Sequence, residues 1–168
     1  MATIHLCRTA YVGFVLAHLE QERGEKIDIG KVVENCLFHD FGEARAIDLD
    51  YVSQKYSKTD ELKAIQDAVR DLSFGKRIIA AFQETEERTT KEGIIAKDAD
   101  QIELLCSLKE VIDNGNQQAK EWIPSLLKRL KTPSAQELAK VIVETNSNDW
   151  WFQNKEDEYW VSGGKKRK

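Results

Sequence analysis

The chain has 168 residues, of which 41% are hydrophobic and 32% are charged, a composition typical of one soluble globular domain. Its net charge of -4 argues against nucleic-acid binding, which favours a basic surface. No apolar run is long enough to span a membrane and no signal peptide is recognisable, so we expect a cytoplasmic protein with no membrane partner. Three cysteines in apolar helical contexts are expected to be reduced and buried: Cys7, Cys36 and Cys106.

Apolar residues recur at three- and four-residue steps from residue 3 to about residue 22, which predicts a helix. Its expected buried face consists of Ile4, Cys7, Ala10, Tyr11, Phe14, Val15 and Leu19. Further helices are expected over 29–40, 59–72, 78–88, 92–114, 116–130 and 134–144, with a helical turn at 42–46 and a loop at 48–57. The sequence therefore predicts an all-α domain of six to eight helices over 1–152, followed by a partly flexible tail at 153–168.

An aromatic cluster lies near the end of the predicted domain, at Trp150, Trp151, Phe152 and Trp160. We expect this cluster to close the hydrophobic core, with a protein interface as the alternative, because aromatic residues are enriched at interfaces.

Four residues that can bind a metal occur in the order His5, His39-Asp40 and Asp100, each in a segment predicted to be helical. Imidazole and carboxylate ligands together suit a first-row divalent metal, so the pattern indicates a metal-centred hydrolase. Glu43 follows His39 by four residues, and a carboxylate there is suited to position or deprotonate a water. The alternative for each residue alone is structural: a hydrogen-bonded core histidine or an aspartate that ends a helix.

Arg8 extends this pattern. It lies one helical turn after His5, and its guanidinium could grip a phosphate beside the metal, unless both side chains are solvated.

Two aspartates and one histidine remain to be placed. Asp98 and Asp100 differ by roughly 200° around their helix axis, so we expect one to face the core and the other the solvent. His18 has no partner pattern and is interpreted as structural.

Three segments, 4–10, 39–48 and 97–103, resemble in order the motifs of the HD-domain phosphohydrolases. The similarity is greatest to the branch that contains 5′-deoxynucleotidases, and it extends from about Thr3 to Phe152. The resemblance implies an all-helical HD domain with one divalent transition metal, Mn, Co, Fe, Ni or Zn. It implies metal ligation by His5, His39, Asp40 and Asp100.

The resemblance also implies that Glu43 lies beside the nucleophilic water and that Asp48 contacts the substrate. The implied reaction hydrolyses a (deoxy)nucleoside 5′-monophosphate, or a similar small phosphate ester, to an alcohol and phosphate. A homo-oligomer is plausible on the same grounds. Because the chain has only 3 histidines, a single metal is expected rather than a two-metal centre.

Two departures from the family pattern support an alternative. The chain begins four residues before His5, where relatives carry a preceding helix, and Ile47 replaces the usual glycine before Asp48. A β-branched residue resists backbone conformations that glycine adopts, so the Asp48 loop is expected to differ in shape. The alternative is a degenerate, non-catalytic HD domain that serves in binding or assembly.

Overall fold

The computed structural model describes residues 2–152, and the predicted tail at 153–168, including Trp160, lies outside the described residues. Eight α-helices and three 3₁₀ helices occur in the described part, which contains no strand and so confirms the all-α prediction. The α-helices are α1 (Ala2–Glu22), α2 (Ile29–Phe38), α3 (Glu61–Ala68), α4 (Gly75–Glu87), α5 (Lys91–Asp113), α6 (Ile123–Leu127), α7 (Pro133–Glu144) and α8 (Asp149–Phe152). The 3₁₀ helices are η1 (Phe41–Ala44), η2 (Ser53–Lys55) and η3 (Gln117–Trp122). None of the helices within residues 2–152 has the length and hydropathy that a membrane span requires.

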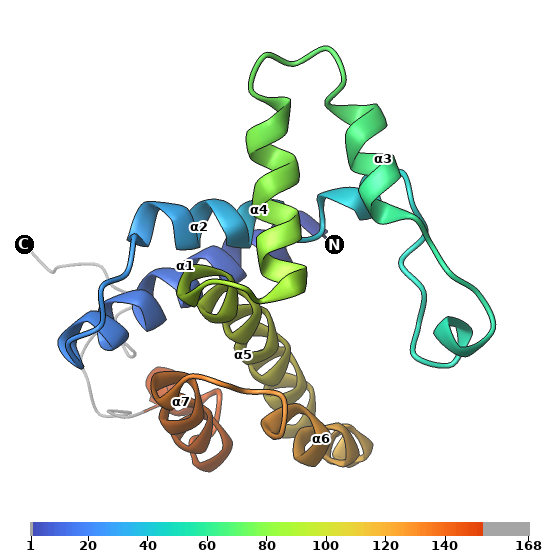
Figure 1. Cartoon of the computed structure of the whole chain (residues 1–168). Coiled ribbons are helices and arrows are strands. Elements are labelled where there is room, and N and C mark those ends of the chain that lie inside the picture. Colours follow the sequence, from blue (N-terminus) through green and yellow to red (C-terminus); the bar gives the residue numbers. More distant parts are fainter. Residues whose placement is uncertain (1, 153–168) are drawn as a thin grey trace, which may run out of the picture.

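Helix α5 is the centre of the bundle, and α1, α2, α4 and α7 all pack against it (Figure 1). Its side chains Ile95 and Ile102 are buried in one core cluster with Leu16 of α1 and Val32 of α2. Burying each such aliphatic side chain contributes roughly 1.5–3 kcal/mol. This cluster fixes α1 and α2 on the same side of α5.

A second, smaller apolar cluster joins α3 and α4, where Ile65 and Phe82 are buried. Phe38, the last residue of α2, and Phe41, the first residue of η1, pack against this cluster. His39 and Asp40 lie between those two phenylalanines in the chain, so the second cluster anchors the segment that carries them.

The prediction for α1 is correct in extent but wrong in the face that is buried. The buried positions of α1 are Thr9, Gly13, Leu16, Ala17 and Glu20. Of the residues predicted to be buried, Ala10 and Leu19 are half-buried, whereas Ile4, Cys7, Tyr11, Phe14 and Val15 are exposed. A Cβ atom on Gly13 would lie 2.5 Å from the Cys36 Sγ, so the small residues of α1 form the face that approaches α2 closely.

Several helix boundaries differ from the prediction. The expected helix over 116–130 is divided into η3 and α6, because Pro124 near the start of α6 has no amide hydrogen to continue the preceding turn. Helix α3 ends at Ala68 rather than residue 72, and α4 begins at Gly75 rather than residue 78. The predicted loop over 48–57 contains η2, where the Asp50 carboxylate accepts a 3.0 Å hydrogen bond from the Ser53 amide.

The prediction that the terminal aromatic cluster closes the core is wrong for the two tryptophans that the structure describes. Trp150 is 66% exposed and Trp151 is 49% exposed. Their rings lie against each other with centroids 4.1 Å apart. The nearest helix before them, α7, contributes Ala135 and Ala139 to the core, and both are fully buried.

The close approach of α4 and α5 can be tested at Gly93. A Cβ atom there would lie 2.3 Å from the backbone oxygen of Glu84, so Gly93→Ala should destabilise the fold by about 1–3 kcal/mol. The matched control is Gly30→Ala in α2, where the nearest atom, Asp28 Oδ1, is 3.4 Å away. That control should be neutral or stabilising by up to about 1 kcal/mol. Urea unfolding measures both, and an equal or higher midpoint for Gly93→Ala would contradict this packing.

Candidate metal centre

The structure brings His5, His39, Asp40 and Asp100 together from three separate elements. His5 comes from α1, Asp100 from α5, and His39 and Asp40 from the segment that directly follows α2. The His5 Nε2 atom lies 3.3 Å from the His39 Nε2 and 3.3 Å from the Asp40 Oδ2. The Asp100 Oδ1 lies 3.4 Å from the His5 Nε2 and 3.7 Å from the His39 Nε2.

This geometry fits a divalent metal. The ligand atoms of His5, His39 and Asp100 all lie within 4.8 Å of one another, so these three residues could hold one ion. The Asp40 Oδ2 is 3.1 Å from the His39 Nε2, so a second carboxylate lies next to these three residues. Two imidazoles and two carboxylates form a donor set that first-row divalent metals accept.

The four side chains also compensate one another's charge. Hydrogen bonds with Asp100 and Asp40 raise the pKa of His5 to about 11. Burial lowers the pKa of His39, but the same two carboxylates outweigh it and raise this pKa to about 9. Burial likewise opposes ionisation of Asp40, yet the two imidazoles lower its pKa to about 2. They also hold the pKa of Asp100 well below its usual range, against the opposing effect of burial.

Glu43 and Asp48 lie in one pocket with Asp40. This pocket has a volume of about 420 Å³. Its charged lining consists of Asp40, Glu43, Asp48, Glu61, Glu86, Lys58 and Lys97. Burial raises the pKa of Glu43 to about 7, and the neighbouring carboxylates of Asp40 and Asp48 add to this shift. A carboxyl group with this pKa can accept or donate a proton near neutral pH.

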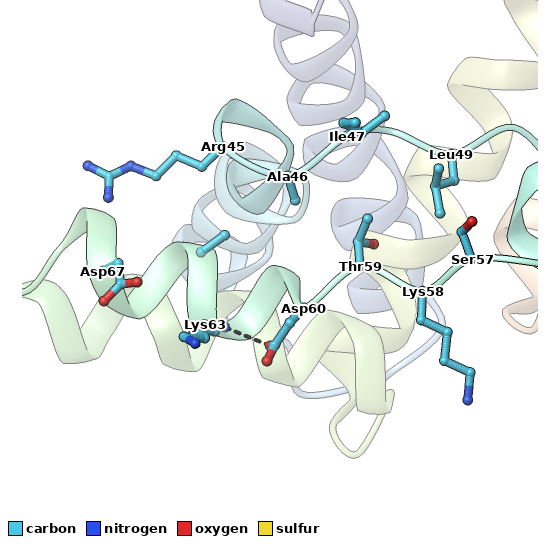
Figure 2. Close-up of a pocket in the computed structure, with 11 residues that line it drawn as sticks. Arg45, Ala46, Ile47, Leu49, Ser57, Lys58, Thr59, Asp60, Lys63 and Asp67 are labelled. Atoms are coloured by element: carbon cyan, nitrogen blue, oxygen red, sulfur yellow. Dashed lines mark hydrogen bonds between the residues drawn. The ribbon is translucent and has the colours of Figure 1, made fainter.

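A second pocket of about 570 Å³ adjoins the first, and the two share Leu49, Ser57, Lys58 and Thr59. Figure 2 shows the segment 45–49 facing the segment 57–60 and the start of α3 across this second pocket. Ile47 lines it and is 73% exposed. In the described part of the chain, Arg88 is the one non-glycine residue with a positive φ. The backbone of Ile47 therefore does not adopt the left-handed conformation that favours glycine. The replacement of glycine at this position is therefore accommodated.

Arg8 is engaged by carboxylates. Its Nε atom lies 3.1 Å from the Glu103 Oε1, and its Nη2 donates a 3.0 Å hydrogen bond to Glu110. Its side chain is still 34% exposed. To bind a substrate phosphate as predicted, the guanidinium would have to contact the phosphate in addition to these two carboxylates.

Sequence reasoning assigned no role to Glu103 or Lys97, which both adjoin the cluster. The Glu103 Oε2 lies 2.6 Å from the His5 Nδ1, and the Lys97 Nζ lies 3.6 Å from the Asp100 Oδ2. Each is three residues from Asp100 and so shares a face of α5 with it. This three-residue spacing from Asp100 is the feature of the sequence that could have identified Lys97 and Glu103 as neighbours of the cluster.

The expectation that Asp98 and Asp100 divide between core and solvent is wrong. Asp98 is 1% exposed, and the Asp100 side chain is only 16% exposed. Asp98 accepts hydrogen bonds from the backbone amides of Lys131 and Thr132, at 3.0 Å and 2.7 Å. It therefore ties α5 to the start of α7, whereas Asp100 faces the two histidines.

Comparisons with known proteins identify a domain family and its relatives. The HD domain family model matches residues 4–142. The 5′-deoxynucleotidase HDDC2 of Dictyostelium discoideum is 32% identical over 113 residues, which make up 63% of this chain. The match spans only 60% of that relative's own length.

Two solved structures share the fold. A conserved hypothetical protein from Pyrococcus furiosus superimposes with a TM-score of 0.71 and 24% identity, over 85% of this chain and 83% of that one. A protein from Pyrococcus horikoshii gives a TM-score of 0.66 and 23% identity, over 83% of this chain and 80% of that one. At these identities the likeness establishes the fold.

The charge balance of the cluster predicts that metal uptake releases protons. In protein stripped of metal by a chelator, the raised pKa values of His5 and His39 keep both imidazoles protonated at pH 7, and a metal ligand must lose its proton. Titration calorimetry in buffers of different ionisation enthalpy should show proton release, and metal affinity should rise from pH 6 to pH 9. Binding enthalpies that do not depend on the buffer would contradict the paired cluster.

The raised pKa of Glu43 predicts a pH-dependent effect on stability. Because this pKa is about 7 in the folded protein and near 4.5 when unfolded, folding favours the protonated form. Ionisation therefore costs stability as the pH rises from 4.5 through 7. Glu43→Gln removes this cost, so its melting temperature in chelator should exceed that of the wild type at pH 8 and match it near pH 4.5. The same difference at both pH values would contradict the shifted pKa.

Proposed function

The chain belongs to the HD domain family, and from that premise we propose that it is a metal-dependent phosphohydrolase. We infer further that its substrate is a (deoxy)nucleoside 5′-monophosphate or a similar small phosphate ester. The similarity to a 5′-deoxynucleotidase supports this substrate class. A small-molecule partner also suits the open, charged pocket beside the cluster. Assembly with a second copy and a cytoplasmic location stay predictions.

The observation that carries the proposal is the position of Glu43. The cluster of His5, His39, Asp40 and Asp100 would hold one divalent metal, Mn, Co, Fe, Ni or Zn. Glu43 shares a pocket with Asp40, and its pKa of about 7 suits a general base.

The proposed reaction breaks the bond between phosphorus and the ester oxygen and transfers the phosphoryl group to water. A divalent metal held by the His5, His39, Asp40 and Asp100 cluster would polarise a phosphate oxygen and would lower the pKa of a water from 15.7 to about 7. Glu43 orients the attacking water and accepts its proton. The departing alkoxide takes up the proton that Glu43 accepted, directly or through water, and leaves as the alcohol.

Two other residues of the pocket would bind the substrate. Burial lowers the pKa of Lys97, but Asp100 and Glu86 outweigh this effect and keep the ammonium group charged. Lys97 can therefore neutralise a phosphate oxygen next to the cluster. Asp48 lines the same pocket and can accept a hydrogen bond from a sugar hydroxyl.

The test is phosphate release from a panel of ribo- and deoxyribonucleoside monophosphates, with each of the five metals or none. We expect metal-dependent release that Glu43→Gln reduces by about 10²–10⁴-fold in kcat, because the base is lost. The matched control is Glu61→Gln, which changes a carboxylate elsewhere in the same pocket and should lose far less activity.

The outcomes separate the two classes of function. Release that requires metal and Glu43 supports the hydrolase and ranks the substrates. Stoichiometric metal binding with no release from any substrate would instead favour the non-catalytic binding protein. Equal losses for Glu43→Gln and Glu61→Gln would contradict the role of Glu43 as the base.

A further inference from the structure

We propose that Glu103 is a positioning residue for the metal centre, which orients the His5 imidazole and so sets the affinity for the metal. This inference rests on the proposed function only in that a metal binds at the His5 cluster. The assignment concerns a side chain that points at the far nitrogen of His5, away from the other three members of the cluster.

The geometry divides the two nitrogens of His5 between two tasks. The Nδ1 atom lies 2.6 Å from the Glu103 Oε2, while the Nε2 atom faces His39, Asp40 and Asp100 at 3.3 to 3.4 Å. A carboxylate at Nδ1 accepts that hydrogen and fixes the tautomer in which Nε2 carries the lone pair. Carboxylate–histidine–metal arrangements of this kind orient the ring and strengthen the ligand.

Glu103 is itself held rigidly. The residue is 5% exposed, and its second oxygen, Oε1, accepts a 2.9 Å hydrogen bond from the Ser107 hydroxyl. The Arg8 Nε lies 3.1 Å from the same oxygen. One oxygen is therefore anchored by α5 and α1, which leaves the other directed at His5.

His39 shows why His5 needs this support. The Nδ1 atom of His39 lies 2.8 Å from the Cys36 backbone oxygen, and the side chain is 1% exposed, so its own helix and the core fix its ring. His5 has a side chain that is 27% exposed and lies near the start of α1. Its Nδ1 partner is a side chain from another helix, so its orientation depends on a contact that can be removed by mutation.

The experiment measures metal affinity without substrate. Chelator-treated wild type, Glu103→Ala, Glu103→Gln and Ser107→Ala are titrated with Zn²⁺ and with Mn²⁺ by calorimetry. Glu103→Ala should weaken binding by about 10–100-fold, as loss of a ligand-orienting carboxylate does. Glu103→Gln keeps an oxygen that can accept the Nδ1 hydrogen and should lose less. Ser107→Ala removes one anchor of Glu103 and should give the smallest loss of the three.

The matched control is Glu110→Gln, which changes the other carboxylate on Arg8 but does not touch His5. Its metal affinity should equal that of the wild type. Long-range ¹H–¹⁵N spectra of the zinc-loaded protein give a second measurement, because they report which nitrogen of His5 carries the proton. Wild type and Glu103→Gln should show protonated Nδ1, whereas Glu103→Ala should show a mixture of ring states.

Glu103→Ala that folds, binds metal with wild-type affinity and keeps a single His5 tautomer would overturn the inference. If Glu103→Ala does not fold, an unchanged affinity in both Glu103→Gln and Ser107→Ala overturns it as well. A wild-type protein that binds no metal also overturns it. Because no substrate is used, tight metal binding that depends on Glu103 would stand even if the panel of nucleotides showed no hydrolysis.

Discussion

Burial of three carboxylates on α5 is the constraint on which the rest of the structure depends. Asp98 and Glu103 are almost fully buried, and the side chain of Asp100 is 16% exposed. A buried charge costs several kcal/mol unless it is paired and hydrogen-bonded, so each carboxylate requires partners from another element. Asp98 meets the amides before α7, Asp100 meets the histidines of α1 and α2, and Glu103 meets α1 again. The helices around α5 are thus placed by hydrogen bonds and ion pairs to these carboxylates as well as by apolar packing.

The same compensation prepares the cluster for a metal. Two imidazoles and two carboxylates balance one another's charge at one partly buried point. A metal that binds here would have to displace protons from the two imidazoles, and the side chains would not have to change conformation. The neighbouring pocket has no such balance, because five carboxylates face two lysines there. That excess of negative charge, together with burial, shifts the pKa of Glu43 into the neutral range.

The sequence predicted the extent of most helices, since periodicity and capping residues act locally. It did not predict which face of α1 is buried, because the close approach of Gly13 to Cys36 arises only when α1 and α2 pack together. Pro124 divided a segment whose apolar pattern is continuous. At the candidate site, the ordered motif predicted which four residues meet. It left open the partners of Arg8, because Glu103 and Glu110 follow it by about a hundred residues and only tertiary packing brings them close.

The two histidines of the cluster therefore depend on the fold to different degrees. His39 is oriented by a carbonyl three residues earlier, so its helix carries both the ligand and its support. His5 is oriented by Glu103, which is 98 residues away, so its half of the site forms only when α1 is docked on α5. A ligand that binds the docked state alone stabilises it in proportion to the logarithm of its concentration over Kd. Metal binding and the docking of α1 should therefore be one coupled equilibrium, with Glu103 as the side chain through which each favours the other.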